Sequence, residues 1–79
     1  MTTWHYLPVI DDDLLLFLIE VHLDNDAKLT GWSERPSSPS GNDQHDLLLS
    51  IALMAGAVAR WEPVRLADLT VGMVFERRA

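Results

Sequence analysis

The chain has 79 residues and no cysteine, so we expect one small domain without disulfides or thiolate metal sites. Its net charge is −6, and residues 1–46 carry nine acidic against two basic residues, a balance of −7. Such an excess repels phosphate backbones and disfavours direct nucleic-acid binding, whereas it suits a basic protein partner. The alternative is that the acids only keep a small protein soluble.

The apolar segments are short. The longest uninterrupted run, residues 14–19, is far below the roughly 20 residues that a membrane-spanning helix needs. Residues 1–6 contain no basic residue ahead of an apolar stretch, unlike a secretory signal. We therefore predict a cytoplasmic protein that does not bind membranes.

The first predicted strand covers residues 4–10. Its alternation places Trp4 and Tyr6 on one face and Leu7 on the other. Pro8 has no N–H to donate to a sheet, so this strand is expected to lie at an edge or to end near Pro8.

The second predicted strand, residues 14–24, has the strongest pattern. Its odd positions form an unbroken apolar face, while its even positions begin apolar and end polar. A helix over residues 14–21 is the alternative. The odd positions are Leu15, Phe17, Ile19, Val21 and Leu23, and the even ones are Leu14, Leu16, Leu18, Glu20, His22 and Asp24.

A turn over residues 24–27 leads into a third strand over residues 28–34. After a Pro- and Ser-rich loop over residues 35–41, Asn42 or Asp43 is placed to cap a helix that Pro63 ends. The spacing of Leu47, Ile51, Met54, Val58 and Trp61 aligns one apolar helix face, and Leu49 and Leu53 point elsewhere.

Residues 64–69 and 71–75 are two further candidates for extended segments, the second interrupted by Gly72. The alternation of Val71, Met73 and Phe75 predicts at least one more strand here. Residues 76–79 are expected to be a frayed tail. The predicted fold is a single α+β domain over residues 1–79. It has a small antiparallel sheet of three to five strands covered on one face by a single helix, in the order β-β-β-α-β.

A single helix can cover only one face of such a sheet, and the even face is also partly apolar. Because leaving its leucines in water is unfavourable, we predict a homodimer through this face. The alternative is that the C-terminal segment folds across it. The residues predicted for self-association are Leu14, Leu16, Leu18, Leu49 and Leu53.

Catalytic and metal-binding patterns are weak. Glu20, His22 and Asp24 share a strand face, but successive positions lie about 6.6 Å apart. Ligands of one ion must converge more closely than this, so a solvated face is the better interpretation. The serines show no nucleophile elbow, and the sequence has no glycine-rich phosphate loop. We predict no catalytic residues, no metal, no cofactor and no enzymatic activity.

The order of strand, long strand and hairpin, followed by Ser40-Gly41-Asn42-Asp43 opening an alanine-rich helix, resembles HicB-type antitoxin domains over residues 4–60. Their Asp-Leu-Pro-Gly segment is replaced by residues 31–36, and no DNA-binding element follows. The pattern is also similar to short bacterial or phage proteins of unassigned role. The resemblance implies occlusion of a small basic RNA-cleaving toxin, and a phage anti-defence protein has the same physical requirements.

We therefore predict a non-catalytic acidic protein-binding module, an inhibitor that occludes a basic, nucleic-acid-binding surface of its partner. The alternative is a structural or accessory subunit that assembles through apolar surfaces. The predicted partner-binding residues are Asp11, Asp12, Asp13, Glu20, Asp24, Asp26, Trp32 and Glu34.

Overall fold

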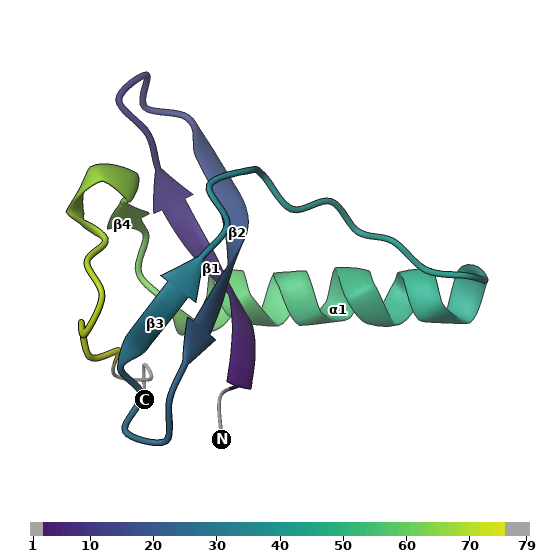
Figure 1. Cartoon of the computed structure of the whole chain (residues 1–79). Helices are drawn as coiled ribbons and strands as arrows, with labels where there is room; N and C mark the ends of the chain where they lie inside the picture. The colour runs from purple at the N-terminus through teal and green to yellow at the C-terminus, as the bar shows by residue number, and fades with distance from the viewer. Residues whose placement is uncertain (1–2, 76–79) are drawn as a thin grey trace.

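The computed structural model describes residues 3–75 and shows an α+β domain, as predicted (Figure 1). The helix is capped by Asp43, whose side-chain Oδ1 accepts a hydrogen bond of 2.8 Å from the backbone N–H of Asp46. The elements are β1 (Thr3–Ile10), β2 (Leu16–Leu23), β3 (Leu29–Trp32), α1 (Gln44–Arg60), β4 (Val64–Arg65) and the 3₁₀ helix η1 (Leu66–Asp68).

The four strands form one sheet in the order β3-β2-β1-β4. The first three strands are antiparallel as expected, but β4 runs parallel to β1, so the sheet is mixed. Helix α1 connects β3 to β4 across the sheet. The chain therefore re-enters the sheet at β4 in the same direction as β1. β4 pairs with Val9 and Ile10, so β1 is an inner strand at these two residues. Pro8 lies just before them, outside the stretch of β1 that pairs with β4.

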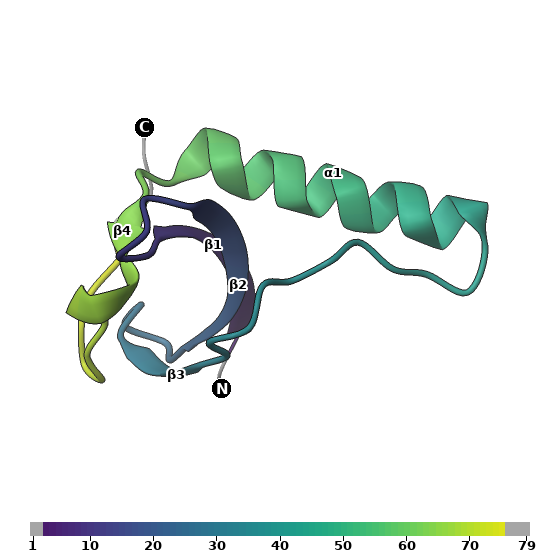
Figure 2. The same cartoon turned by 90° about the horizontal axis from the view of Figure 1, so that it is seen from above.

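The sheet curls into a partial barrel, and the core fills its concave side (Figure 2). The odd positions of β2 point inward, as the alternation predicts, and Ile19 is fully buried. Leu15 lies before β2 begins and is exposed. The buried core consists of Leu7, Val9, Ile19, Val21, Leu23, Leu29 and Leu69.

The C-terminal segment, residues 66–75, closes the open side of this curl. Leu69 is buried in the core, and the backbone N–H of Leu29 donates a hydrogen bond of 2.7 Å to the carbonyl of Met73. The further strand is present as β4, within the first of the two candidate segments. Residues 71–75 form no strand: Val74 makes an isolated bridge with Lys28, and the backbone N–H groups of Gly72 and Phe75 donate to the carbonyls of Leu29 and Ala27. A turn ending at Gly72, with φ of +94°, interrupts the alternation. The predicted frayed tail, residues 76–79, lies outside the described residues.

The helix packs on the convex side of the sheet (Figure 2). This is the side of the even positions of β2, so α1 covers part of the second apolar face and the C-terminal segment covers the first. Among the helix residues only Met54 and Ala57 are buried. Leu47 and Ile51 of the predicted apolar stripe remain exposed, because the N-terminal half of α1 extends past the sheet (Figures 1 and 2). Val58, near the C-terminal end of α1, is exposed as well.

The connection from β3 to α1 runs beside this projecting half. The backbone N–H of Ser37 donates to the carbonyl of Leu18 at 2.7 Å, and that of Ser40 donates to the Ser50 hydroxyl at 3.2 Å. A Cβ atom at Gly41 would collide with the backbone between Asp46 and Leu47, so the loop meets the helix start at a point where only glycine fits.

Candidate functional site

An apolar groove lies between one side of α1 and the convex side of the sheet. Its volume is about 450 Å³, and its only polar lining residue is Ser37. Val58 stands on its helix side and is 57% exposed, as is Leu16 on its sheet side. The lining residues are Pro8, Leu16, Phe17, Leu18, Ser37, Val58, Trp61 and Pro63.

The apolar surface continues from Leu16 to the β1–β2 turn through Leu14 and Leu15. Leu14 is 78% exposed and has φ of +64°, a left-handed conformation that disfavours a residue with a branched side chain. A leucine held in this conformation and in water gains nothing from core packing.

The predicted partner-binding acids do not form one continuous face. Asp11, Asp12 and Asp13 lie in the turn before β2, and Asp24 and Asp26 lie in the turn after it. An eight-residue strand separates the two turns by about 25 Å.

One acidic group is assembled from distant parts of the sequence. Glu34 follows β3, yet it lies with Asp11 and Asp12 around a shallow hollow of about 250 Å³ that Leu66 and Ala67 complete. The carboxylates of this group share one end of the molecule with the exposed leucines of the β1–β2 turn.

Asp24 has a structural role in its turn. Its carboxylate accepts backbone hydrogen bonds from Lys28 at 3.0 Å and from Asp26 at 2.9 Å. The Lys28 hydrogen bond is the main reason that the pKa of Asp24 lies below its usual value.

The other two predicted partner-binding residues lie apart from these groups. Glu20 is exposed on the convex side of β2, opposite Tyr6 in β1. Trp32 is half-buried and packs against the core. Neither residue lines the groove.

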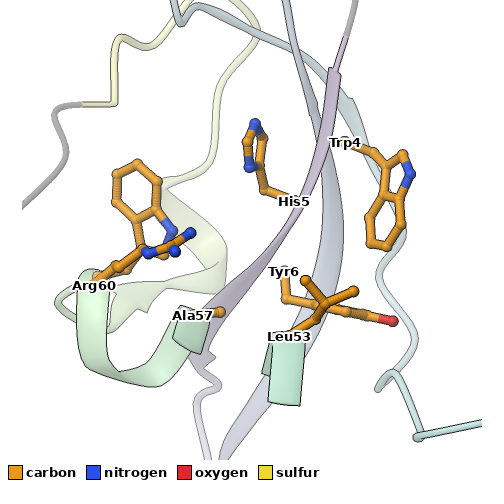
Figure 3. Close-up of a pocket in the computed structure, with 7 residues that line it drawn as sticks. Trp4, His5, Tyr6, Leu53, Ala57 and Arg60 are labelled. Atoms are coloured by element: carbon orange, nitrogen blue, oxygen red, sulfur yellow. The ribbon is translucent and has the colours of Figure 1, made fainter. Parts of the chain in front are cut away.

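A second hollow, of about 120 Å³, lies on the other side of α1 (Figure 3). In Figure 3, Trp4 and Tyr6 project to one side of β1 and His5 to the other, and Leu53 and Ala57 face the strand from α1. The rings of Trp4 and Tyr6 meet edge to face with centroids 5.1 Å apart. Arg60 and Trp61 complete the lining.

The predicted self-association residues are divided between the two sides of α1. Leu16 and Leu18 line the groove, Leu14 extends it, and Leu53 borders the smaller hollow. Leu49 and Leu53 are 51% and 57% exposed and lie on the same side of the helix.

The described residues contain no cluster of three or more His, Asp or Glu side chains that could hold a metal ion. Glu20, His22 and Asp24 are therefore not brought together. No polar side chain in this part of the chain is buried without a hydrogen-bond partner.

Sequence reasoning missed the groove as a site. The helical spacing places Val58 and Trp61 in one apolar stripe, and Pro8 and Pro63 indicate only limits of a strand and of the helix. The surplus of apolar residues over the amount that one small sheet can cover was the available signal. It does not locate the groove, because that depends on where α1 crosses the strands.

Comparison of the chain with protein-family models, with curated proteins and with solved structures gives no match. Within the described residues, the structure has no helix that combines the length and apolar character needed to cross a membrane.

Proposed function

We propose that this chain is a non-catalytic protein-binding module, whose groove beside α1 receives an apolar segment of a basic partner protein. The observation that carries the proposal is the groove itself, about 450 Å³ in volume and almost entirely apolar in its lining. Apolar clefts of several hundred cubic ångströms are typical of binding sites.

The energetics of the exposed surface support binding. Leu16 lines the groove from the sheet and Val58 lines it from the helix, and both are more than half exposed. Burying such a side chain fully stabilises a complex by about 1.5–3 kcal/mol. A partner that covers both residues, together with Leu14, would obtain most of its binding free energy from a small contact area, as is typical of interfaces with hot-spot residues.

The charge distribution supports a basic partner. Asp11, Asp12 and Asp13 lie in the β1–β2 turn, directly before the exposed Leu14 and Leu15 that extend the apolar surface from Leu16. Acidic groups beside an apolar groove favour a segment in which apolar side chains are followed by Lys or Arg. They act mainly on the association rate, which falls as salt screens them.

The groove is tested with two variants and a matched control. Leu16→Glu and Val58→Glu place a charge in the groove, whereas Leu48→Glu makes the same change at a residue that is 64% exposed and does not line it. Tagged wild-type protein is used to capture a partner from host lysate at low and high salt, and the purified partner is titrated by calorimetry. We expect both groove variants to weaken binding by at least tenfold and Leu48→Glu to bind normally.

Equal binding by all four proteins would refute the groove as the binding surface. Circular dichroism is used to check that each variant is folded. We expect little loss of stability, because all three positions are exposed. Binding that is unaffected by salt would refute the basic character of the partner while leaving the groove in place.

A second candidate function is inhibition, in which the domain occludes the nucleic-acid-binding surface of a toxin or a defence nuclease. The observation that favours it is the convergence of Asp11, Asp12 and Glu34 at one end of the molecule. Three carboxylates around a hollow can replace phosphates on a basic surface.

This candidate has its own variants. The double variant Asp12→Lys, Glu34→Lys reverses charge at the hollow. The double variant Glu20→Lys, Asp26→Lys changes the net charge equally at exposed residues that do not line the hollow, and is the matched control. We expect the first double variant to lose competition with nucleic acid for the captured partner and the control to keep it. Loss of competition in both would indicate a nonspecific effect of net charge.

A further inference from the structure

The side of α1 that faces away from the groove carries a regular pattern. Asp46, Leu49, Leu53, Gly56 and Arg60 follow one another at steps of three, four, three and four residues, the spacing of a coiled-coil seam. Val58, which lines the groove, lies on the opposite side of the helix. The two leucines are more than half exposed, and Asp46 and Arg60 are exposed as well.

We propose that this stripe pairs with the same stripe of a second copy of the chain, with the two helices antiparallel and the two-fold axis at Leu53. In this register Leu53 meets Leu53 of the second copy. Asp46 of each copy then meets Arg60 of the other, since both lie seven residues from Leu53 on opposite ends. A two-fold interface must be self-complementary, and this stripe meets that condition.

The charges select the antiparallel arrangement. A parallel pair would place Asp46 beside Asp46 and Arg60 beside Arg60, which is repulsive at both ends. The antiparallel pair makes two opposite-charge contacts instead. Neither side chain forms an ion pair within the described residues, so both are available for contacts between copies.

The smaller hollow fits the same register. Leu49 of the second copy would stand opposite Ala57, which lines that hollow together with Trp4, Tyr6 and Leu53 (Figure 3). The hollow has a volume of about 120 Å³. This is of the order of the ~150 Å³ cavity that truncation of a buried leucine leaves, so one leucine side chain can fill it.

The pairing also accounts for the projecting half of α1. The N-terminal half of each helix lies beyond its own sheet (Figure 2), and in the antiparallel pair it lies beside the C-terminal half of the other helix. There it covers the convex side of the other sheet near Trp4, which is 49% exposed. The β3–α1 loop contacts Ser50 and leaves the side of α1 that bears Leu49 and Leu53 exposed.

The absence of cysteine makes a direct test possible. Leu53→Cys introduces one thiol at the proposed axis, and Leu48→Cys introduces one at an exposed position on another side of α1. Under mild oxidation, Leu53→Cys is expected to form a disulfide-linked dimer rapidly, because the two Cβ atoms approach one another at the axis. Leu48→Cys is expected to cross-link at least tenfold more slowly. Equal cross-linking of the two proteins would overturn the proposal.

Charge reversal tests the register. In sedimentation equilibrium the wild-type chain is expected to be a dimer at tens of micromolar, and Arg60→Asp is expected to raise the dimer dissociation constant by about tenfold. The double variant Asp46→Arg, Arg60→Asp should restore the wild-type constant. A monomeric wild-type chain at 100 µM, or a double variant weaker than Arg60→Asp, would overturn the proposal. Val58→Glu should remain dimeric, which separates this interface from the groove.

Discussion

Asp11 and Asp24 occupy the same position in the two hairpin turns of the sheet. The Oδ1 of each accepts hydrogen bonds from the backbone N–H groups two and four residues later. The residue three positions after each aspartate is left-handed, with φ of +64° at Leu14 and +60° at Ala27. Two of the acids that the sequence suggests for partner binding therefore also hold the hairpins in register.

The left-handed residues predict a stabilising substitution. Ala27→Gly removes the steric cost of a left-handed Cβ, about 1–2 kcal/mol, and adds part of the backbone entropy cost of glycine. We expect a net gain of about 0.5–1 kcal/mol in the free energy of unfolding, measured by urea denaturation. Ala59→Gly, at an exposed position within α1, is the control and should lose about 1 kcal/mol. A loss at Ala27 as well would contradict the role given to this turn.

Asp24 predicts a pH dependence of stability. Its pKa is lower in the folded protein, chiefly because the Lys28 N–H bonds to the carboxylate, so its contribution is present above the unfolded pKa of about 3.9. That contribution is lost as the pH falls through the lower folded value. We expect Asp24→Ala to destabilise the protein at neutral pH and to flatten the acid limb of a stability profile measured by urea titration. Asn25→Ala, in the same turn, removes no ionisable group and should keep the wild-type acid limb.

The core predicts an uneven response to truncation. Ile19 is fully buried inside the curled sheet, and Ile19→Ala is expected to cost about 2–5 kcal/mol in the free energy of unfolding. Leu48→Ala on the exposed helix should change stability by less than about 0.5 kcal/mol in the same assay. Similar losses at both positions would mean that α1 is packed more closely than the structure shows.

Gly41 predicts a local effect on the helix start. A Cβ atom at this position would overlap the backbone between Asp46 and Leu47, so Gly41→Ala must push the loop away from the first turn. We expect lower helix content by circular dichroism and faster amide exchange in residues 44–48. Gly31→Ala, where an added Cβ meets nothing within 4 Å, is the matched control and should leave exchange in the helix unchanged.

The strand pattern predicted much of the fold because strand alternation is a local property. The apolar odd positions of β2 point into the core, and Asp43 caps α1, as the residues themselves indicate. The alternation at Val71, Met73 and Phe75 was misleading, since a turn ending at Gly72 reverses the chain there. The sequence shows that β2 has two apolar faces, but not which element covers each one. That choice depends on the path of the chain after α1.

The candidate site was less predictable. Counting acids indicates an excess in the first part of the chain, yet the length of β2 places Asp11 and Asp24 at opposite ends of the sheet. The meeting of Glu34 with Asp11 and Asp12 depends on where the chain leaves β3. The groove needs Pro8 and Val58 together, and no local pattern relates two residues so far apart in the sequence.

The closure of the curled sheet by the C-terminal segment has a consequence for how this chain can change over time. No residue of α1 belongs to the buried cluster inside the curl, so most helix positions are not constrained by the interior. Substitutions at the exposed positions of α1 are therefore expected to cost little in folding, in contrast to the buried Met54 and Ala57. The curled sheet can therefore stay constant while the exposed positions of α1 vary in sequence.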